Sequence, residues 1–456
     1  MMGHQPRHES LFYYFRLEDE IPSDHLLRLI DRVVDFGFVR NRLQGTYSAI
    51  GRPSIDPEVL VRLLLVGYLY GITSERRLMQ EVRMHLAYRW FVRLNFDQPI
   101  PDHSTISKNR HGRFRESGVF REVFEEIVGR CLAAGLIDGR HLIVDGTLVA
   151  ADASARSRVT RTESPERAHV SRSVEDYLTE LERENPVEPS MAPTLTPTQA
   201  LPPTRSTTDP DAAWAVKRGP AAFAYFDHYL VDRDSRVIVG VDATPARFSQ
   251  ETEAARRMLD HVGQLGLHPE SLSADKAYGS GEFLAWLLGR GIQPYIAVID
   301  RRHQRKGRFN RDDFRYEPAE DVYVCPGGQA LRYRGEQYGT QGVIYSSLPS
   351  QCRLCPQKVR CTSGRYRKLF VHRHEAARET VRALSRTAAY TQARRTRYRI
   401  EALFGELKQQ MRLRRVRLRR LWNVAEQFHL AAAAQNLKRL VRVLARQAPH
   451  PAGSTA

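Results

Sequence analysis

The sequence has few cysteines and no long apolar run. Five cysteines among 456 residues are too few for a secreted protein stabilised by disulfide bonds. The longest apolar stretch, residues 59–71, is interrupted by Arg62 and is too short to cross a bilayer. The first residues contain no apolar segment followed by a cleavage site, so we expect no signal peptide. These absences predict a soluble, reduced, cytoplasmic protein with no membrane partner.

Acidic residues are outnumbered by basic ones. The chain has 70 lysines and arginines against 52 aspartates and glutamates, which gives a formal net charge of +18. An excess of this size favours a polyanionic partner, and nucleic acid is the most common one. A basic surface that only contacts solvent is the alternative. The length allows two or three domains, each with its own core.

The pattern of residues 1–135 predicts a helical domain. Pro57 suits the first turn of a helix, and the apolar residues after it recur at helical spacing. Ser74 followed by Glu75 predicts the start of a second helix, and His103 predicts the start of another. Short helices with basic residues on the outside suit a module that binds DNA ends. A plain helical packing domain is the alternative.

From Gly139 the pattern changes to short apolar strands. Residues 136–153 and 214–308 together predict an α/β core with a sheet of mixed strand directions. The expected elements are strands at 141–145, 223–231 and 237–241, a helix at 250–265, a strand at 271–275, a helix at 281–290 and a strand at 294–299.

The remaining segments differ from the core in composition. Residues 154–213 are polar and hold seven prolines from Pro186 to Pro210, so we expect a disordered linker with at most a short helix at 174–181. Residues 309–367 form an insert that carries cysteines, and residues 375–446 predict helices.

Two aspartates stand at the ends of predicted strands. Asp145 ends the first strand of the core, and Asp275 ends the fourth. Ligands of α/β proteins commonly bind at the carboxyl ends of strands. Phosphodiester cleavage by two Mg²⁺ ions needs acidic oxygens around metals that lie about 4 Å apart. A single aspartate at a strand end is more often a turn or cap residue, so that alternative stays open.

A third carboxylate lies on a predicted basic helix. Glu401 follows Arg397 by one turn and precedes Lys408 by two turns, so the three side chains share a face. This face offers a carboxylate to a metal and two cations to phosphate. Glu406 points about 140° away from Glu401 and is the poorer ligand candidate. An exposed helix with ordinary ion pairs is the alternative.

This helix resembles the third catalytic block of DDE transposases of bacterial insertion sequences. In that family the block has Arg, three residues, Glu, six residues and Lys, and Arg397, Glu401 and Lys408 match it. The family often has Tyr three residues before the Arg, where this chain has Arg394.

Other motifs resemble the same family in the same order. Residues 101–107 are similar to a segment of the family's amino-terminal domain. Residues 143–147 resemble the strand with the first Asp, and residues 274–279 resemble the block with the second Asp. Together the resemblance covers most of the chain outside the proline-rich linker.

The resemblance implies an RNase H-like core and a DNA transposase activity. Asp145, Asp275 and Glu401 would be catalytic and would bind two Mg²⁺ or Mn²⁺ ions. Water would attack the phosphodiester at an element end, and the freed 3′-hydroxyl would attack target DNA without a covalent protein–DNA intermediate. The implied partners are terminal inverted repeats and target DNA, held by a homodimer in the bacterial cytoplasm, with nucleoid association when DNA is bound.

Two other functions remain open at this point. One is a catalytically silent, transposase-derived DNA-binding regulator. The other is a metal-dependent nuclease that cleaves DNA and does not join it. The presence of all three carboxylates favours the transposase over the regulator.

The insert holds four of the five cysteines. Cys352 and Cys355 have the spacing of a zinc-knuckle pair, and Cys325 and Cys361 could complete a tetrahedral Zn²⁺ site. Four unliganded thiols are the alternative. Cys131 lies in an apolar helix and is predicted to be a core residue.

Two basic segments are candidates for DNA binding. In residues 408–420, seven of thirteen residues are Lys or Arg, and we expect this segment to continue the helix of Glu401. Contacts of such residues with phosphate make binding strongly salt-dependent. A solvated charged face is the alternative. The candidate DNA-binding residues are Arg397, Lys408, Arg412, Arg414, Arg415 and Arg417, and in the amino-terminal domain Arg76, Arg77, Lys108 and Arg110.

Overall fold

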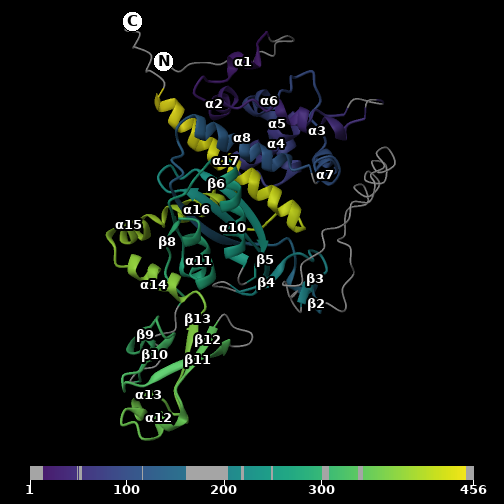
Figure 1. Cartoon of the computed structure of the whole chain (residues 1–456). Coiled ribbons are helices and arrows are strands. Elements are labelled where there is room, and N and C mark those ends of the chain that lie inside the picture. Colours follow the sequence, from purple (N-terminus) through teal and green to yellow (C-terminus); the bar gives the residue numbers. More distant parts are fainter. Residues whose placement is uncertain are drawn as a thin grey trace, which may run out of the picture. The chain divides into compact units, whose positions relative to one another are not determined.

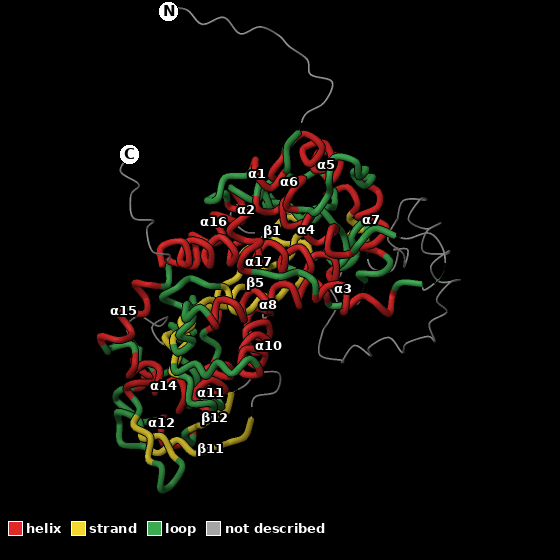
Figure 2. The backbone as a smooth tube through the Cα atoms, turned by 90° about the horizontal axis from the view of Figure 1, so that it is seen from above, coloured by secondary structure: helices red, strands yellow, loops and turns green. Residues whose placement is uncertain are grey.

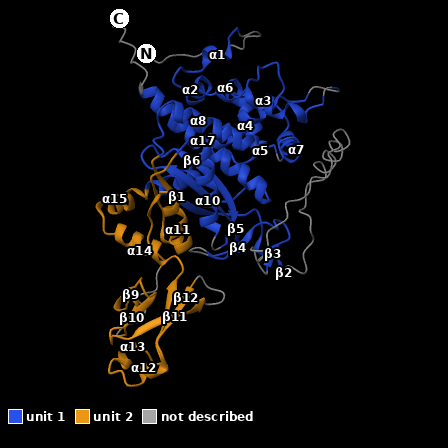
Figure 3. Ribbon diagram, in the orientation of Figure 1, with its two compact units in different colours: residues 1–139, 145–267, 399–456 blue, residues 140–144, 268–398 orange. Residues whose placement is uncertain are grey.

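The computed structural model describes residues 14–48, 50, 54–115, 117–160, 204–216, 220–247, 250–299, 308–336 and 342–447. The chain divides into two compact units (Figure 3). Unit 1 comprises Met1–Gly139, Asp145–Leu267 and Arg399–Ala456, and unit 2 comprises Arg140–Val144 and His268–Tyr398. Strand β1 (His141–Ala150) begins in unit 2 and ends in unit 1.

Helices make up the amino-terminal part of unit 1 (Figure 1), which confirms the helical character expected there. They are α1 (Leu17–Glu20), α2 (Leu26–Val33), α3 (Phe38–Leu43), α4 (Pro57–Leu69), α5 (Glu75–Met84), α6 (Leu86–Phe91), α7 (His103–His111) and α8 (Val119–Ala133). Helix α17 (Leu421–Gln447), from the other end of the sequence, packs against α8, α4 and α2, and Figure 2 shows it among these helices.

Side-chain caps confirm two of the predicted helix starts. The Ser74 hydroxyl accepts a hydrogen bond from the backbone N–H of Arg77 at 3.3 Å, at the start of α5. The Asp102 carboxylate accepts one from the N–H of Ser104 at 2.8 Å, at the start of α7. Each cap satisfies an N–H group that has no partner within its helix.

A buried arginine lies in the middle of α4. Arg62 is 1% exposed, and its guanidinium donates hydrogen bonds to Glu58 at 2.8 Å and to Asp31 at 2.7 Å. The same group lies over the rings of Phe36 and Phe91, at 4.9 and 5.0 Å from their centroids. An arginine can be buried here because carboxylates pair with its charge and aromatic rings cover its faces.

Helices cover the sheet of unit 1 on both faces. Strand β5 pairs antiparallel with β4 and β6 and has β1 as its other neighbour. At Gly240 a Cβ would lie 3.2 Å from Leu230 and from Met258 of α10, so α10 approaches β6 where a side chain is missing. On the opposite face, the ring of Tyr229 stacks on Phe404 of α16 with centroids 5.0 Å apart. The bounds are β4 (Ala213–Ala215), β5 (Ala222–Asp232), β6 (Ile238–Pro245), α10 (Gln250–Gln264) and α16 (Arg399–Gln409).

Unit 2 contains a parallel part and an antiparallel part. The first residues of β1 pair in parallel with β7, and β7 pairs in parallel with β8, beside α11, α14 and α15. The cysteine-bearing insert is an antiparallel sheet in the order β13-β12-β11-β10-β9, with α12 and α13 between β12 and β13 in the sequence. The bounds are β7 (Ser271–Ser273), β8 (Gln293–Tyr295), β9 (Arg315–Glu317), β10 (Val322–Val324), β11 (Ala330–Glu336), β12 (Gly342–Ser346), β13 (Lys368–His372), α11 (Gly281–Gly289), α12 (Pro349–Arg353), α13 (Lys358–Cys361), α14 (Glu375–Leu384) and α15 (Ala388–Thr396).

The predicted fold class is confirmed, with a helical amino-terminal part, a mixed sheet and a cysteine-bearing insert. Two expectations about strands and the linker are corrected. Asp145 does not end its strand, because β1 runs on for five more residues to Ala150. The ends of the linker are ordered, because β2 (Arg158–Thr160) pairs with β3 (Thr204–Ser206). The short helix expected at 174–181 lies outside the described residues.

A third correction concerns the basic segment after α16. This helix ends at Gln409, so residues 410–420 do not continue it. Arg412 and Arg420 adopt φ angles of 56° and 73°, which an α-helix does not accommodate. Within the described part of the chain, no helix combines the length and the apolar composition that spanning a membrane requires.

Replacement of Arg62 by alanine is expected to lower the free energy of unfolding by about 3–5 kcal/mol, because it removes the buried guanidinium that pairs with Glu58 and Asp31. Denaturant unfolding of the full chain measures this. The control is Arg93→Ala, because Arg93 pairs with the same Asp31 at 3.0 Å but has a side chain that is 55% exposed. Its loss should cost less than about 1 kcal/mol. Equal losses in the two variants would contradict this account of Arg62.

Candidate active site

Helix α16 carries an apolar stripe and a polar face. Ile400, Leu403, Phe404 and Leu407 are buried at helical spacing, which fixes the helix against the rest of unit 1. Glu401 lies in the first turn outside this stripe and is exposed. The stripe therefore determines which side of α16 is available for chemistry.

A lysine of α16 joins the helix to β1 within unit 1. The Lys408 ammonium donates a hydrogen bond to the Thr147 hydroxyl at 2.6 Å. Asp145 precedes Thr147 by two residues and so shares its face of the strand. Glu401 precedes Lys408 by two helical turns and so shares its face of α16. One contact thus directs the face of α16 that bears Glu401 toward the face of β1 that bears Asp145.

On the opposite face of β1, Gly146 packs closely against His228 of β5. The backbone N–H of Gly146 donates to the Asp145 carboxylate at 2.8 Å. A Cβ at Gly146 would lie 2.8 Å from Nδ1 of His228, whose Nε2 is 2.7 Å from the hydroxyl of Thr244. Because no side chain larger than hydrogen fits between β1 and His228, Gly146 lets the two strands pack closely beside Asp145.

The structure adds a buried acid that the sequence analysis missed. Asp227 of β5 is 0% exposed, and Lys408 is the positive charge that acts on it. Burial raises the pKa of Asp227 well above its ordinary value, although the charge of Lys408 opposes the shift. A charged residue inside the apolar strand 222–232 was the signal in the sequence.

Asp275 lies in unit 2, just after β7. Its carboxylate accepts a hydrogen bond from the N–H of Ala277 at 2.8 Å and caps the short 3₁₀ helix Lys276–Tyr278. The cap holds the carboxylate in a fixed place at the end of the strand. The prediction that Asp275 ends its strand is corrected, because β7 ends two residues earlier, at Ser273.

Arg397 does not lie on the helix of Glu401. It is the C-cap of α15, where its N–H makes the last helical bond to the carbonyl of Ala393 at 3.1 Å, and α16 begins only at Arg399. The expectation of one continuous helix face from Arg397 is therefore wrong. Two tyrosines lie near Arg394, the position where the family often has Tyr: Tyr390 is buried, and Tyr398 is 66% exposed.

Glu406 has a structural role within unit 1. Its carboxylate pairs with Arg439 at 2.9 Å and with Lys438 at 3.5 Å, both on α17, and accepts a hydrogen bond from Gln435 at 3.2 Å. These contacts hold α16 against α17. They agree with the prediction that Glu406 is a poorer ligand candidate than Glu401.

The arginines of residues 410–420 divide into two groups. Arg412, Arg414 and Arg415 are exposed, although Arg415 also donates to the carbonyl of Ala151 at 3.1 Å. Arg417, Arg419 and Arg420 are half-buried. Arg417 donates to backbone carbonyls of unit 1 and lies 4.8 Å from the ring centroid of Tyr68. Only the first group presents its charge openly to solvent.

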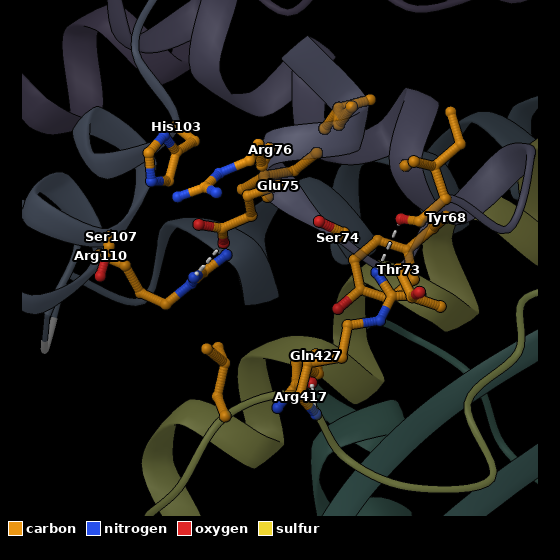
Figure 4. Close-up of a pocket in the computed structure, with 15 residues that line it drawn as sticks. Tyr68, Thr73, Ser74, Glu75, Arg76, His103, Ser107, Arg110, Arg417 and Gln427 are labelled. Atoms are coloured by element: carbon orange, nitrogen blue, oxygen red, sulfur yellow. Dashed lines mark hydrogen bonds and ion pairs between the residues drawn. The ribbon is translucent and has the colours of Figure 1, made fainter. Parts of the chain in front are cut away.

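The basic residues of the amino-terminal helices also differ in their contacts. Arg110 is 6% exposed and pairs with Glu75 at 2.7 Å, and the exposed Arg77 pairs with Glu81 at 3.1 Å. Lys108 is half-buried on α7. Arg76 and Arg110 line a pocket of about 310 Å³ in unit 1, shown in Figure 4.

The four cysteines of the insert line one small, mostly apolar cavity of about 20 Å³ in unit 2. Burial raises the pKa of the Cys361 thiol, and the other three cysteines add to the shift. Among the residues that the structure describes, however, no group of three or more His, Cys, Asp or Glu side chains is arranged so that it could hold a metal ion. Cys131 is buried in α8, as predicted for a core residue.

Two family models match the chain. The transposase domain (DUF772) matches residues 15–112, and the transposase DDE domain matches residues 324–441. The first range includes α1 to α7, and the second includes the four cysteines of the insert and α16. These matches confirm the resemblance to DDE transposases of the insertion-sequence type, which are enzymes that cut and join DNA.

The chain was also compared with curated proteins and with solved structures. No curated protein matches the chain. Among solved structures, the chain is similar to the piggyBac transposase in its synaptic complex with hairpin DNA. The identity is 8% and the TM-score is 0.33, over 94% of this chain and 82% of that one.

Proposed function

We propose that this chain is a DNA transposase that cleaves DNA at the ends of its element and joins those ends to target DNA. The observation that carries the proposal is the contact between Lys408 and Thr147. It sets the helix of Glu401 against the face of β1 that bears Asp145. The matches to a transposase domain and a transposase DDE domain support the same conclusion.

Asp145, Asp275 and Glu401 are the proposed ligands of two Mg²⁺ or Mn²⁺ ions. Carboxylate oxygens fit these ions, which prefer oxygen ligands. Register supports the two aspartates: in unit 2, β1 and β7 pair in parallel up to Ile143 opposite Ser273. Asp145 follows Ile143 by two residues, and Asp275 follows Ser273 by two residues.

The proposed reaction has two steps at phosphorus. In the first, the oxygen of water bonds to phosphorus, and the bond to the 3′-oxygen of the element end breaks. In the second, that 3′-hydroxyl attacks a phosphodiester of target DNA and releases a 3′-oxygen of the target strand. Bound ions would supply polarisation of the attacking oxygen and charge stabilisation of the leaving oxygen. Lys408, oriented by Thr147, would bind a phosphate oxygen next to the reacting group.

The exposed arginines extend this proposed DNA contact. Arg412, Arg414 and Arg415 would bind the phosphate backbone, as would Arg397, and binding should therefore weaken steeply with salt. We propose a homodimer that holds two element ends together, because joining both ends to one target requires two active sites.

A strand-joining assay tests the proposed ligands. Pre-cut terminal repeats, target plasmid and Mg²⁺ or Mn²⁺ are incubated with wild type or with Asp145→Asn, Asp275→Asn or Glu401→Gln. Wild type should join ends to target, and each variant should bind DNA normally but join about 1000-fold more slowly, because a metal ligand is lost. The control is Glu406→Gln, which removes a carboxylate of the same helix that already serves the contact with α17. It should keep most of the joining activity.

Different outcomes would support other functions. Wild type that binds ends but neither cuts nor joins them would be a DNA-binding regulator. Wild type that cuts without joining would be a nuclease. Full activity in any of the three carboxylate variants would remove that residue from the ligand set.

A second proposal concerns the insert, where Cys325, Cys352, Cys355 and Cys361 would hold a structural Zn²⁺ ion. Their common cavity supports this, because four thiolates are a complete tetrahedral ligand set for zinc. Because the described side chains are not arranged to hold a metal ion, zinc binding would require the four thiols to move toward one another. The ion would tie α12 and α13 to the turn after β10.

Metal analysis of the purified chain tests the zinc proposal. Wild type should contain about one zinc per chain, released by a thiol reagent. Cys355→Ser should lose the metal and unfold at a lower temperature. Cys131→Ala, which removes the thiol outside the insert, should keep the metal. Wild type without zinc, or an unchanged zinc content in Cys355→Ser, would contradict the proposal.

A further inference from the structure

The pocket of about 310 Å³ in unit 1 has no role in the proposed chemistry. Three separate segments line it: the end of α4 with the start of α5, helix α7, and the chain at the start of α17. Figure 4 shows Arg76, His103 and Arg110 on one side of the pocket and Tyr68 and Thr73 on the other. Its size is at the lower end of the range for small-ligand sites.

Positive charge exceeds negative charge around this pocket. Arg76, Arg110 and Arg417 line it, and Glu75 is the carboxylate among its lining residues. Glu75 is already paired with Arg110 at 2.7 Å. The nearby acid Glu426 opposes this charge little, because burial raises its pKa to about 8. An anionic ligand therefore fits the pocket better than a neutral or cationic one.

Arg76 is the cation best placed to bind an anion. It is exposed at the pocket and makes no ion pair with any residue in the described part of the chain. Arg417, in contrast, uses its donors on the carbonyls of Ile72 and Met411. A phosphate at Arg76 would gain a charge-assisted hydrogen bond without breaking an existing one.

The rest of the wall suits a flat, partly apolar group. Leu64, Ile72 and Leu78 contribute apolar surface, and Ser107 contributes a hydroxyl group. In duplex DNA a paired base exposes only its edge, in a groove. A protein contacts that edge with a protruding helix. A concave pocket instead takes a base that has left the stack. Phosphate, apolar surface and hydrogen-bonding groups together describe one nucleotide.

We propose that this pocket binds a single unpaired nucleotide of the DNA strand at an element end, with its phosphate at Arg76. The inference rests on the proposed function, because it takes DNA as the substrate. A free mononucleotide offers the same chemistry, so the test includes both sources. Binding is measured without any cleavage step, so a failure of the proposed catalysis would not affect the result.

The probes are two DNA hairpins that share one duplex sequence, a blunt hairpin and a hairpin with one unpaired 5′-phosphorylated thymidine at its end. Fluorescence anisotropy measures their affinities for the full chain at one fixed salt concentration. Wild type should bind the overhang probe about tenfold more tightly than the blunt probe, which is the effect of stacking one base.

Two variants should abolish that difference. Arg76→Ala removes the phosphate ligand, and Thr73→Trp fills the pocket from an exposed position on its wall. The control is Arg83→Ala, which removes the same charge two turns further along α5 and outside the pocket. It should keep the tenfold preference. Circular dichroism of each variant establishes that it is folded.

Several outcomes would overturn the inference. One is equal binding of both probes by wild type, and another is a tenfold preference that survives in both pocket variants. Displacement of the overhang probe by thymidine 5′-monophosphate at micromolar concentration would assign the pocket to a free nucleotide instead. If neither probe binds at all, the DNA-binding part of the proposed function fails, and this inference fails with it.

Discussion

The contact between Lys408 and Thr147 is the interaction on which the proposed site of unit 1 depends. The two residues are 261 positions apart in the sequence, and their 2.6 Å hydrogen bond ties α16 to β1. The apolar stripe of α16 packs beside it, with Phe404 stacked on Tyr229. Since strand side chains alternate and helix side chains recur every two turns, this one contact orients two carboxylates at once.

The sequence was informative where a residue's role is local. Helix caps such as Ser74 and Asp102 depend on a few neighbouring residues, and the alternation of strands and helices in the core depends on short apolar runs. The choice of Glu401 over Glu406 needed only the angle between them on a helix, and the structure uses Glu406 in packing against α17. The fold class followed from these local patterns, and the transposase family followed from the order of the motifs.

Long-range contacts could not be predicted in the same way. Asp227 is buried because α16 covers its strand, which no pattern within β5 reveals. The segment after Gln409 is rich in arginine, yet α16 ends at Gln409, Arg412 and Arg420 adopt left-handed φ angles, and Arg417 lies over the ring of Tyr68. The composition also gave no indication that β2 pairs with β3, because the proline-rich segment separates the two strands in the sequence. Each case depends on a contact between segments that are distant in the sequence.

Metal-directed cleavage of the protein backbone would test the central claim most directly, since it locates the ion instead of the reaction. Fe²⁺ replaces Mg²⁺ in the purified chain, ascorbate and peroxide generate hydroxyl radicals at the ion, and mass spectrometry identifies the cut peptide bonds. The account predicts cuts close to Asp145, Asp275 and Glu401 that excess Mg²⁺ suppresses and that Glu401→Gln weakens at all three places. Cuts near only one of these residues, or a pattern unchanged in Glu401→Gln, would contradict a shared set of ligands.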